Sequence, residues 1–117
     1  MKKSIINIPI YDYRLHVIVT SDIEEVNKKY NLNYSNFKGL CLRHTKRRLL
    51  SIIFNNKKGI NFGTIAHEIV HVKNYIFYEC GYNNDVSNDE AEAYFVGWLT
   101  NKVVTTLKKM GEFDKCI

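Results

Sequence analysis

The sequence predicts an α+β fold in which a small mixed sheet of about four strands packs with three helices. Two observations support this prediction. The first half of the chain carries four short apolar runs separated by polar turns, and the second half carries apolar residues at helical spacing. The length of 117 residues, with 45% hydrophobic and 25% charged residues, is typical of one soluble globular domain. We therefore expect residues 1–117 to form a single domain.

The four apolar runs of the first half are rich in β-branched and aromatic residues, which favour strands. They cover residues 4–10, 15–20, 37–44 and 49–54. Segments 11–14 and 45–48 supply short polar turns within the two pairs. Between the pairs, Ser21 precedes Glu24 by three residues, which is the spacing of a capping box, and this predicts a helix at about residues 21–30. The pattern does not define the order of the strands.

Two longer helices are predicted in the second half of the chain. From about residue 62 to 80, apolar residues recur at the spacing of a helix packed on a core, and Gly81 is a natural stop. This stripe consists of Ile65, Ile69, Val72 and Ile76. A last helix is predicted from about residue 89 to 109, and Ser87, Asn88 or Asp89 can cap it. Its apolar surface consists of Phe95, Trp98, Leu99, Val103 and Leu107.

The charge balance is mildly basic, with 17 Lys and Arg against 12 Asp and Glu. The basic residues form short clusters scattered along the chain, so we interpret them as solvated turns and helix ends and expect no nucleic acid partner. The longest strongly apolar stretches have about seven residues, far short of a membrane span, and the first residues lack the apolar core of a signal peptide. We therefore expect no membrane partner and a cytoplasmic location.

Three cysteines, Cys41, Cys80 and Cys116, form an odd set with no C-x-x-C spacing. This pattern argues against both a disulfide framework and a zinc finger. We expect reduced and mostly buried thiols, and Cys80 in particular to be a buried thiol.

The most informative segment is His67-Glu68-Ile69-Val70-His71, which matches the pattern H-E-x-x-H. Residues four apart lie on one face of a helix, so both imidazoles can bind one zinc ion (Zn²⁺) through their ring nitrogens. Glu68 lies one step round the helix, where its carboxylate can hold and deprotonate a metal-bound water. The sequence thus predicts His67 and His71 as metal ligands and Glu68 as the general base. The alternative is that all three are ordinary, partly exposed helix residues.

A catalytic zinc ion usually has three protein ligands, so one more is expected from elsewhere in the chain. The start of the last predicted helix offers Glu90 and Glu92, which project about 200° apart and so cannot both be ligands. We favour Glu90, because it shares a helix face with Tyr94 and Gly97, and Gly97 would let this helix approach the histidines closely. The alternative for Glu90 is a capping interaction with Ser87, and Glu92 is the other candidate for the third ligand.

Two segments, HEIVH and DEAEAYFVGWLT, resemble the gluzincin type of zinc metallopeptidase, and the small single-domain form is similar to zinc peptidases encoded by bacteriophages. The resemblance covers residues 60–101. It implies a minimal zincin-like fold, with His67, His71 and Glu90 as zinc ligands and Glu68 as general base. Better characterised gluzincins add a second lobe that completes the substrate cleft, and 117 residues leave no room for one.

The function that the motif and the resemblance predict is hydrolysis of peptide bonds, with a peptide or protein as substrate. Negative charge builds on the carbonyl oxygen during such a reaction, and Tyr94 or His44 can donate a hydrogen bond to it. The alternative for each is a structural or surface residue. An exposed edge strand can hold an extended substrate by strand addition, and residues 49–54 are the candidate. These residues equally suit a core strand.

The alternative function comes from a different class of protein. It is a catalytically inactive structural or accessory protein, such as a phage virion component, that retains the fold. Because the chain lacks a second lobe, we expect that a partner chain or a virion assembly can complete the site. The resemblance then implies either the cytoplasm of a bacterial host or association with the virion.

Overall fold

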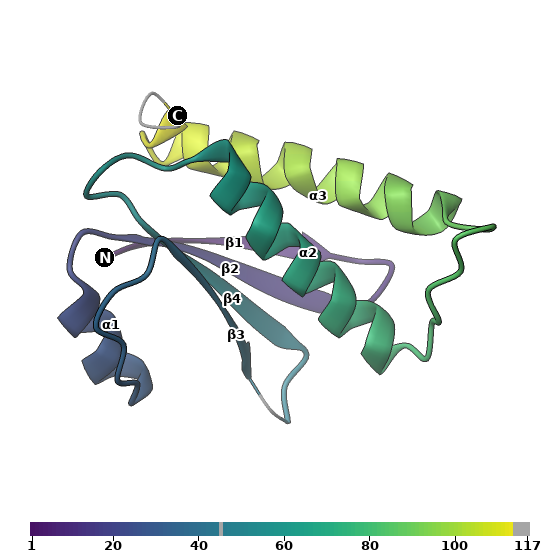
Figure 1. Cartoon of the computed structure of the whole chain (residues 1–117), viewed down its shortest axis with the longest axis horizontal. Helices are drawn as coiled ribbons and strands as arrows, with labels where there is room; N and C mark the ends of the chain where they lie inside the picture. Colours follow the sequence, from purple (N-terminus) through teal and green to yellow (C-terminus); the bar gives the residue numbers. More distant parts are fainter. Residues whose placement is uncertain (45, 114–117) are drawn as a thin grey trace.

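The computed structural model describes residues 1–44 and 46–113 and shows a four-stranded mixed sheet with three helices, which is the α+β fold that the sequence predicts. Thr45, in the predicted turn at 45–48, and Cys116 lie outside the described residues. The elements in chain order are β1 (Lys2–Ile8), β2 (Tyr13–Thr20), α1 (Ile23–Tyr30), β3 (Gly39–His44), β4 (Leu49–Asn55), α2 (Phe62–Glu79) and α3 (Glu90–Lys109) (Figure 1).

The sheet has the order β1-β2-β4-β3. The outer pairs, β1 with β2 and β3 with β4, are antiparallel, whereas β2 and β4 run parallel in the centre. The suggestion that residues 49–54 form an exposed edge strand is therefore wrong. These residues pair on both sides and are all buried, which explains their nearly continuous apolar run. The edge strand beside α2 is β3 instead.

The two faces of the sheet carry cores of different size. On one face α2 and α3 pack side by side, and alternate residues of the central strands, such as Val17 and Ile52, belong to this larger core. Figure 1 shows both helices on this side of the sheet. On the other face α1 contributes Val26, which packs with Ile18 and Ile53. The alternation of partners along β2 and β4 follows from the period-two geometry of a strand.

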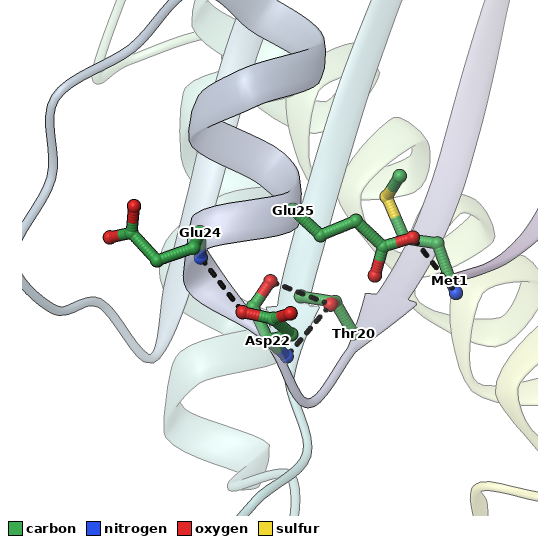
Figure 2. Close-up of polar contacts among 5 residues, drawn as sticks. All are labelled: Met1, Thr20, Asp22, Glu24 and Glu25. Carbon is green, nitrogen blue, oxygen red and sulfur yellow. Dashed lines mark hydrogen bonds and ion pairs between the residues drawn. The ribbon is translucent and has the colours of Figure 1, made fainter.

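The start of α1 differs from the predicted capping box. Asp22, not Ser21, is the N-cap residue, and its Oδ1 accepts a hydrogen bond from the backbone N–H of Glu24 at 3.0 Å. Thr20 fixes this turn, because its hydroxyl accepts from the Asp22 N–H at 3.0 Å and donates to the Asp22 carbonyl at 3.1 Å (Figure 2). Aspartate and serine are comparable N-caps, so the sequence alone did not choose between them.

The helix pair α2 and α3 ends where the sequence predicts. Gly81, just past α2, has a φ of 71°, the left-handed conformation that glycine adopts without steric cost. Phe95, Leu99, Val103 and Leu107 are the buried residues of α3. Across residues 1–44 and 46–113, no helix is both long enough and apolar enough to cross a membrane.

Candidate metal centre

The H-E-x-x-H segment lies in the middle of α2, as the sequence predicts. The stripe that begins at Ile65 and Ile69 is buried against the sheet, with 2% and 1% of these side chains exposed. His67 and His71 lie on the solvent side of the same helix and are both exposed. A ligand can therefore reach the two imidazoles without any change in the fold.

The two imidazoles converge on each other. Their Nε2 atoms are 3.2 Å apart, and the ring centroids are 4.9 Å apart. Two nitrogens that bind one tetrahedral zinc ion at 2.0–2.1 Å would lie about 3.3 Å from each other. The spacing of His67 and His71 therefore fits two ligands of one zinc ion.

Glu68 points to the other side of the motif, toward the edge strand β3. It is only 4% exposed, and its side chain lies against Gly39, which Thr64 also contacts. Burial raises the pKa of this carboxyl, while the neighbouring His67 and His71 oppose that shift. A carboxylate with a raised pKa binds a proton more readily, and this property suits a general base that works near neutral pH.

Cys41 on β3 lies close enough to Glu68 for the two groups to interact electrostatically. Cys41 is partly buried on β3, and burial together with the charge of Glu68 raises the pKa of its thiol to about 12. In the metal-free chain this thiol is therefore protonated at neutral pH. The expectation of a buried thiol at Cys80 is wrong, since this residue is the C-cap of α2 and is exposed.

The structure does not bring Glu90 to the histidines. It places α3 on the side of α2 that carries Lys73, whose Nζ lies 2.6 Å from Glu92 Oε1. Lys73 is two residues after His71, or about 200° round the helix, so the histidines face away from α3. Glu92, not Glu90, is thus the acidic residue of α3 that faces α2.

The face of α3 that carries Glu90 and Gly97 does not lie against α2. A methyl group at Gly97 would meet nothing within 4 Å, so this glycine does not mark a close approach between the helices. Glu90 itself is exposed as the first residue of α3. The alternative capping interaction is absent as well, because the Ser87 hydroxyl donates to Asp85 Oδ1 at 2.7 Å instead. Four-residue spacing identifies a helix face but not the partner that the face meets.

Neither predicted hydrogen-bond donor for the carbonyl oxygen lies at the histidines. Tyr94 is 76% exposed and lines an apolar groove at the β1–β2 turn, together with Ile10 and Trp98. His44 lies on the sheet face that α1 covers, where its Nε2 is 2.8 Å from Ser51 Oγ. Side chains alternate along β3, so His44 falls on the opposite face from the residues that meet α2.

Two features beside the motif were missed by the sequence reasoning. Gly39 lets β3 lie against Glu68, and Lys38 precedes it at the rim of a hollow of about 410 Å³ that reaches His67 and Glu68. A glycine at the start of a predicted strand is the signal that could have indicated a close approach. The hollow itself depends on packing between β3 and α2 and has no signature in the sequence.

The arrangement unites two of the predicted ligands with the predicted base. Among the residues that the structure describes, no group of three or more His, Cys, Asp or Glu side chains lies close enough together to hold a metal ion. None of the family models, curated proteins or solved structures compared with the chain matches it. The candidate metal centre therefore consists of His67, His71 and Glu68.

Proposed function

We propose that this protein is a zinc-dependent metallopeptidase that hydrolyses peptide bonds with an activated water, and that Glu68 is its general base. One observation carries the proposal: two exposed imidazole nitrogens lie 3.2 Å apart, and the intervening motif residue is a buried carboxyl with a raised pKa. This pairing of a chelating site with a basic carboxylate is what metal-assisted hydrolysis requires.

Three residues of the chain have distinct roles in the proposed reaction. His67 and His71 would hold the metal through Nε2, and a bound zinc ion supplies a Lewis acid that acidifies water and polarises a carbonyl. A carboxylate oxygen of Glu68 accepts the proton of the attacking water. The protonated Glu68 then donates that proton to the nitrogen of the leaving amine, which restores the base.

The third ligand is proposed to be Glu90. The other candidate, Glu92, forms an ion pair with the buried Lys73. If the Glu92 carboxylate moved to a metal, the buried charge of Lys73 would lose this partner. Glu90 is exposed and follows the polar loop after α2, so the start of α3 has to move for its carboxylate to reach the histidines. A water molecule or a partner chain in the same position is the alternative.

The test measures zinc content and peptide cleavage on purified variants. We expect about one zinc per chain in the wild type and its loss in His67→Ala and His71→Ala. Glu68→Gln should keep the metal and lose activity by about 10²-fold or more, because it retains the shape but not the base. Glu90→Ala and Glu92→Ala, compared at equal folded fraction, distinguish the two candidate third ligands.

Two results would contradict the proposal. One is a wild-type chain that binds no zinc at micromolar concentration, and the other is full activity in Glu68→Gln. Either result would favour the other class of function, a structural or accessory protein, for example in a phage virion.

A further inference from the structure

A second hollow, of about 340 Å³, opens beside the one that reaches His67 and Glu68. Its walls come from the segment before β3, the β4–α2 connection and the first turn of α2. The two hollows share four lining residues, Phe37, Lys38, Asn61 and Thr64. They therefore form one continuous surface, which we call the rim surface.

The rim surface is basic where it lies furthest from the histidines. Lys38, Lys57 and Lys58 line the second hollow, and no aspartate or glutamate does. All three lysines are exposed. Among the ion pairs of residues 1–44 and 46–113, none involves these three lysines. Their charges are available to a ligand.

Two of the asparagines that line this hollow, Asn55 and Asn61, form hydrogen bonds within the protein. Asn61 Oδ1 accepts a hydrogen bond from the Gly63 N–H at 2.6 Å. Asn55 donates from Nδ2 to the Phe37 carbonyl at 3.2 Å and accepts from the Lys57 N–H at 3.0 Å. These bonds fix the turn that carries the lysines. The ammonium groups of Lys38, Lys57 and Lys58 are the charged groups of this hollow, and they favour an anionic ligand.

The distance between the lysine-lined hollow and the proposed catalytic residues suits a peptide. Asn61 lines this hollow and precedes His67 by six residues, which corresponds to about 9 Å along a helix. An extended peptide covers that distance with about three residues. A side chain that enters the lysine-lined hollow would therefore belong to the same peptide as a bond held at His67 and Glu68.

We propose that the lysine-lined hollow of the rim surface is a specificity pocket for an acidic side chain, Asp or Glu, about three residues from the scissile bond. The inference rests on the proposed peptidase function, because only a peptidase has a scissile bond, but the pocket and its charge do not depend on catalysis. A nucleic acid fits less well, because three lysines around one hollow with apolar walls at Phe37 and Ile60 do not form an extended basic track.

The test uses binding, so that it does not depend on turnover. The probes are fluorescein-labelled mixtures of six-residue peptides. For each of the six positions there is one mixture with Glu at that position and one with Gln, and the other five positions are randomised. Their affinity for the Glu68→Gln chain is measured by fluorescence anisotropy. At one position we expect the Glu mixture to bind about tenfold more tightly than the Gln mixture, and this preference should shrink at 1 M salt.

The lysines are tested with a matched pair of double variants. Lys57→Gln with Lys58→Gln should abolish the preference for Glu. Lys46→Gln with Arg47→Gln removes the same charge from the β3–β4 turn, at the opposite end of these strands, and should keep the preference. Equal binding of Glu and Gln mixtures at every position would overturn the proposal. So would an equal loss in both double variants, or displacement of the peptide by a lower concentration of a single-stranded oligonucleotide.

The outcome also separates this inference from the peptidase proposal. A wild-type chain that cleaves none of the mixtures, while the Glu preference is present and depends on Lys57 and Lys58, contradicts the proposed function and supports the acidic-ligand pocket. Cleavage by the wild type without any preference for Glu supports the proposed function and overturns the pocket.

Discussion

Gly39 at the start of β3 lies directly against the side chain of Glu68 on α2. A methyl group in place of the glycine hydrogen would lie 2.9 Å from Glu68 Oε2 and 2.7 Å from Thr64 Cγ2. The edge strand therefore covers the carboxylate, which is 4% exposed, and this burial is the main cause of its raised pKa. The geometry of the proposed base depends on one residue of a different element.

The first prediction concerns this contact. Gly39→Ala should destabilise the fold by about 1–3 kcal/mol, because the added methyl group forces Glu68 and Thr64 to shift in a packed site. The control is Gly97→Ala, where a methyl group meets nothing within 4 Å and a mid-helix alanine should stabilise by about 0.5–1 kcal/mol. Urea unfolding measures both. A Gly39→Ala variant as stable as the wild type would show that the contact is loose.

The second prediction concerns the cost of keeping Glu68 buried. A carboxyl with a raised pKa in the folded state binds its proton more tightly there than in the unfolded chain, so stability falls as pH rises from the ordinary value of 4.5 through the raised pKa. In metal-free protein with a chelator present, Glu68→Gln should therefore be more stable than the wild type at pH 7. The difference should vanish near pH 4.

The control for this comparison is Glu79→Gln at the exposed end of the same helix. This variant should stay within about 0.5 kcal/mol of the wild type at both pH values, since the residue is at the surface. Urea unfolding of the wild type and the two variants at pH 4 and pH 7 gives the six free energies of unfolding that this comparison needs. Equal stability of Glu68→Gln and the wild type at pH 7 would mean that the buried carboxylate carries no penalty.

Local elements of this fold could be predicted because their signals are local. The stripe from Ile65 to Ile76 has helical spacing and Gly81 follows it, so α2 was predicted with bounds that differ by one residue from the structure. The two strands of each antiparallel pair are joined by short polar turns, and all four appear within a few residues of the expected positions. Two histidines four residues apart had to share a face once the helix was known.

What could not be predicted depends on how elements meet. From the sequence, residues 49–54 suited either an exposed edge strand or a core strand, and only the parallel pairing of β4 with β2 distinguishes the two. The rotation of α3 against α2 was equally open. Glu90 and Glu92 both precede the apolar residues of α3, and only the ion pair with the buried Lys73 identifies Glu92 as the one that faces α2. Pairings across long sequence separations carry no short-range signal.

The third prediction concerns the two described cysteines. At pH 8, a thiol with a pKa of about 12 is ionised in about one molecule in 10⁴, and Cys41 is also partly buried. Cys80 is exposed. In a Cys116→Ser background, iodoacetamide should therefore alkylate Cys80 at least about 10²-fold faster than Cys41, as followed by mass spectrometry of the peptides. Similar rates at the two positions would show that β3 opens readily beside Glu68.

The last prediction concerns the ion pair that joins α2 to α3. The side chain of Lys73 is 7% exposed and that of Glu92 is 24% exposed, with 2.6 Å between Nζ and Oε1. Glu92→Ala leaves the lysine buried without this partner and should cost about 2–3 kcal/mol, less than for a fully buried pair because Glu92 is partly solvated. Lys73→Met keeps the length of the side chain, removes the buried charge and should cost about 1 kcal/mol or less.

Glu90→Ala is the matched control on the same helix, and its cost should stay within about 0.5 kcal/mol because the side chain is exposed. Urea unfolding of the three variants tests the order. If Glu90→Ala and Glu92→Ala lower the free energy of unfolding equally, Glu92 does not face α2 as the structure shows. The result also determines how the zinc content of Glu92→Ala is interpreted. Loss of zinc from this variant identifies Glu92 as a ligand only if α2 and α3 are still folded.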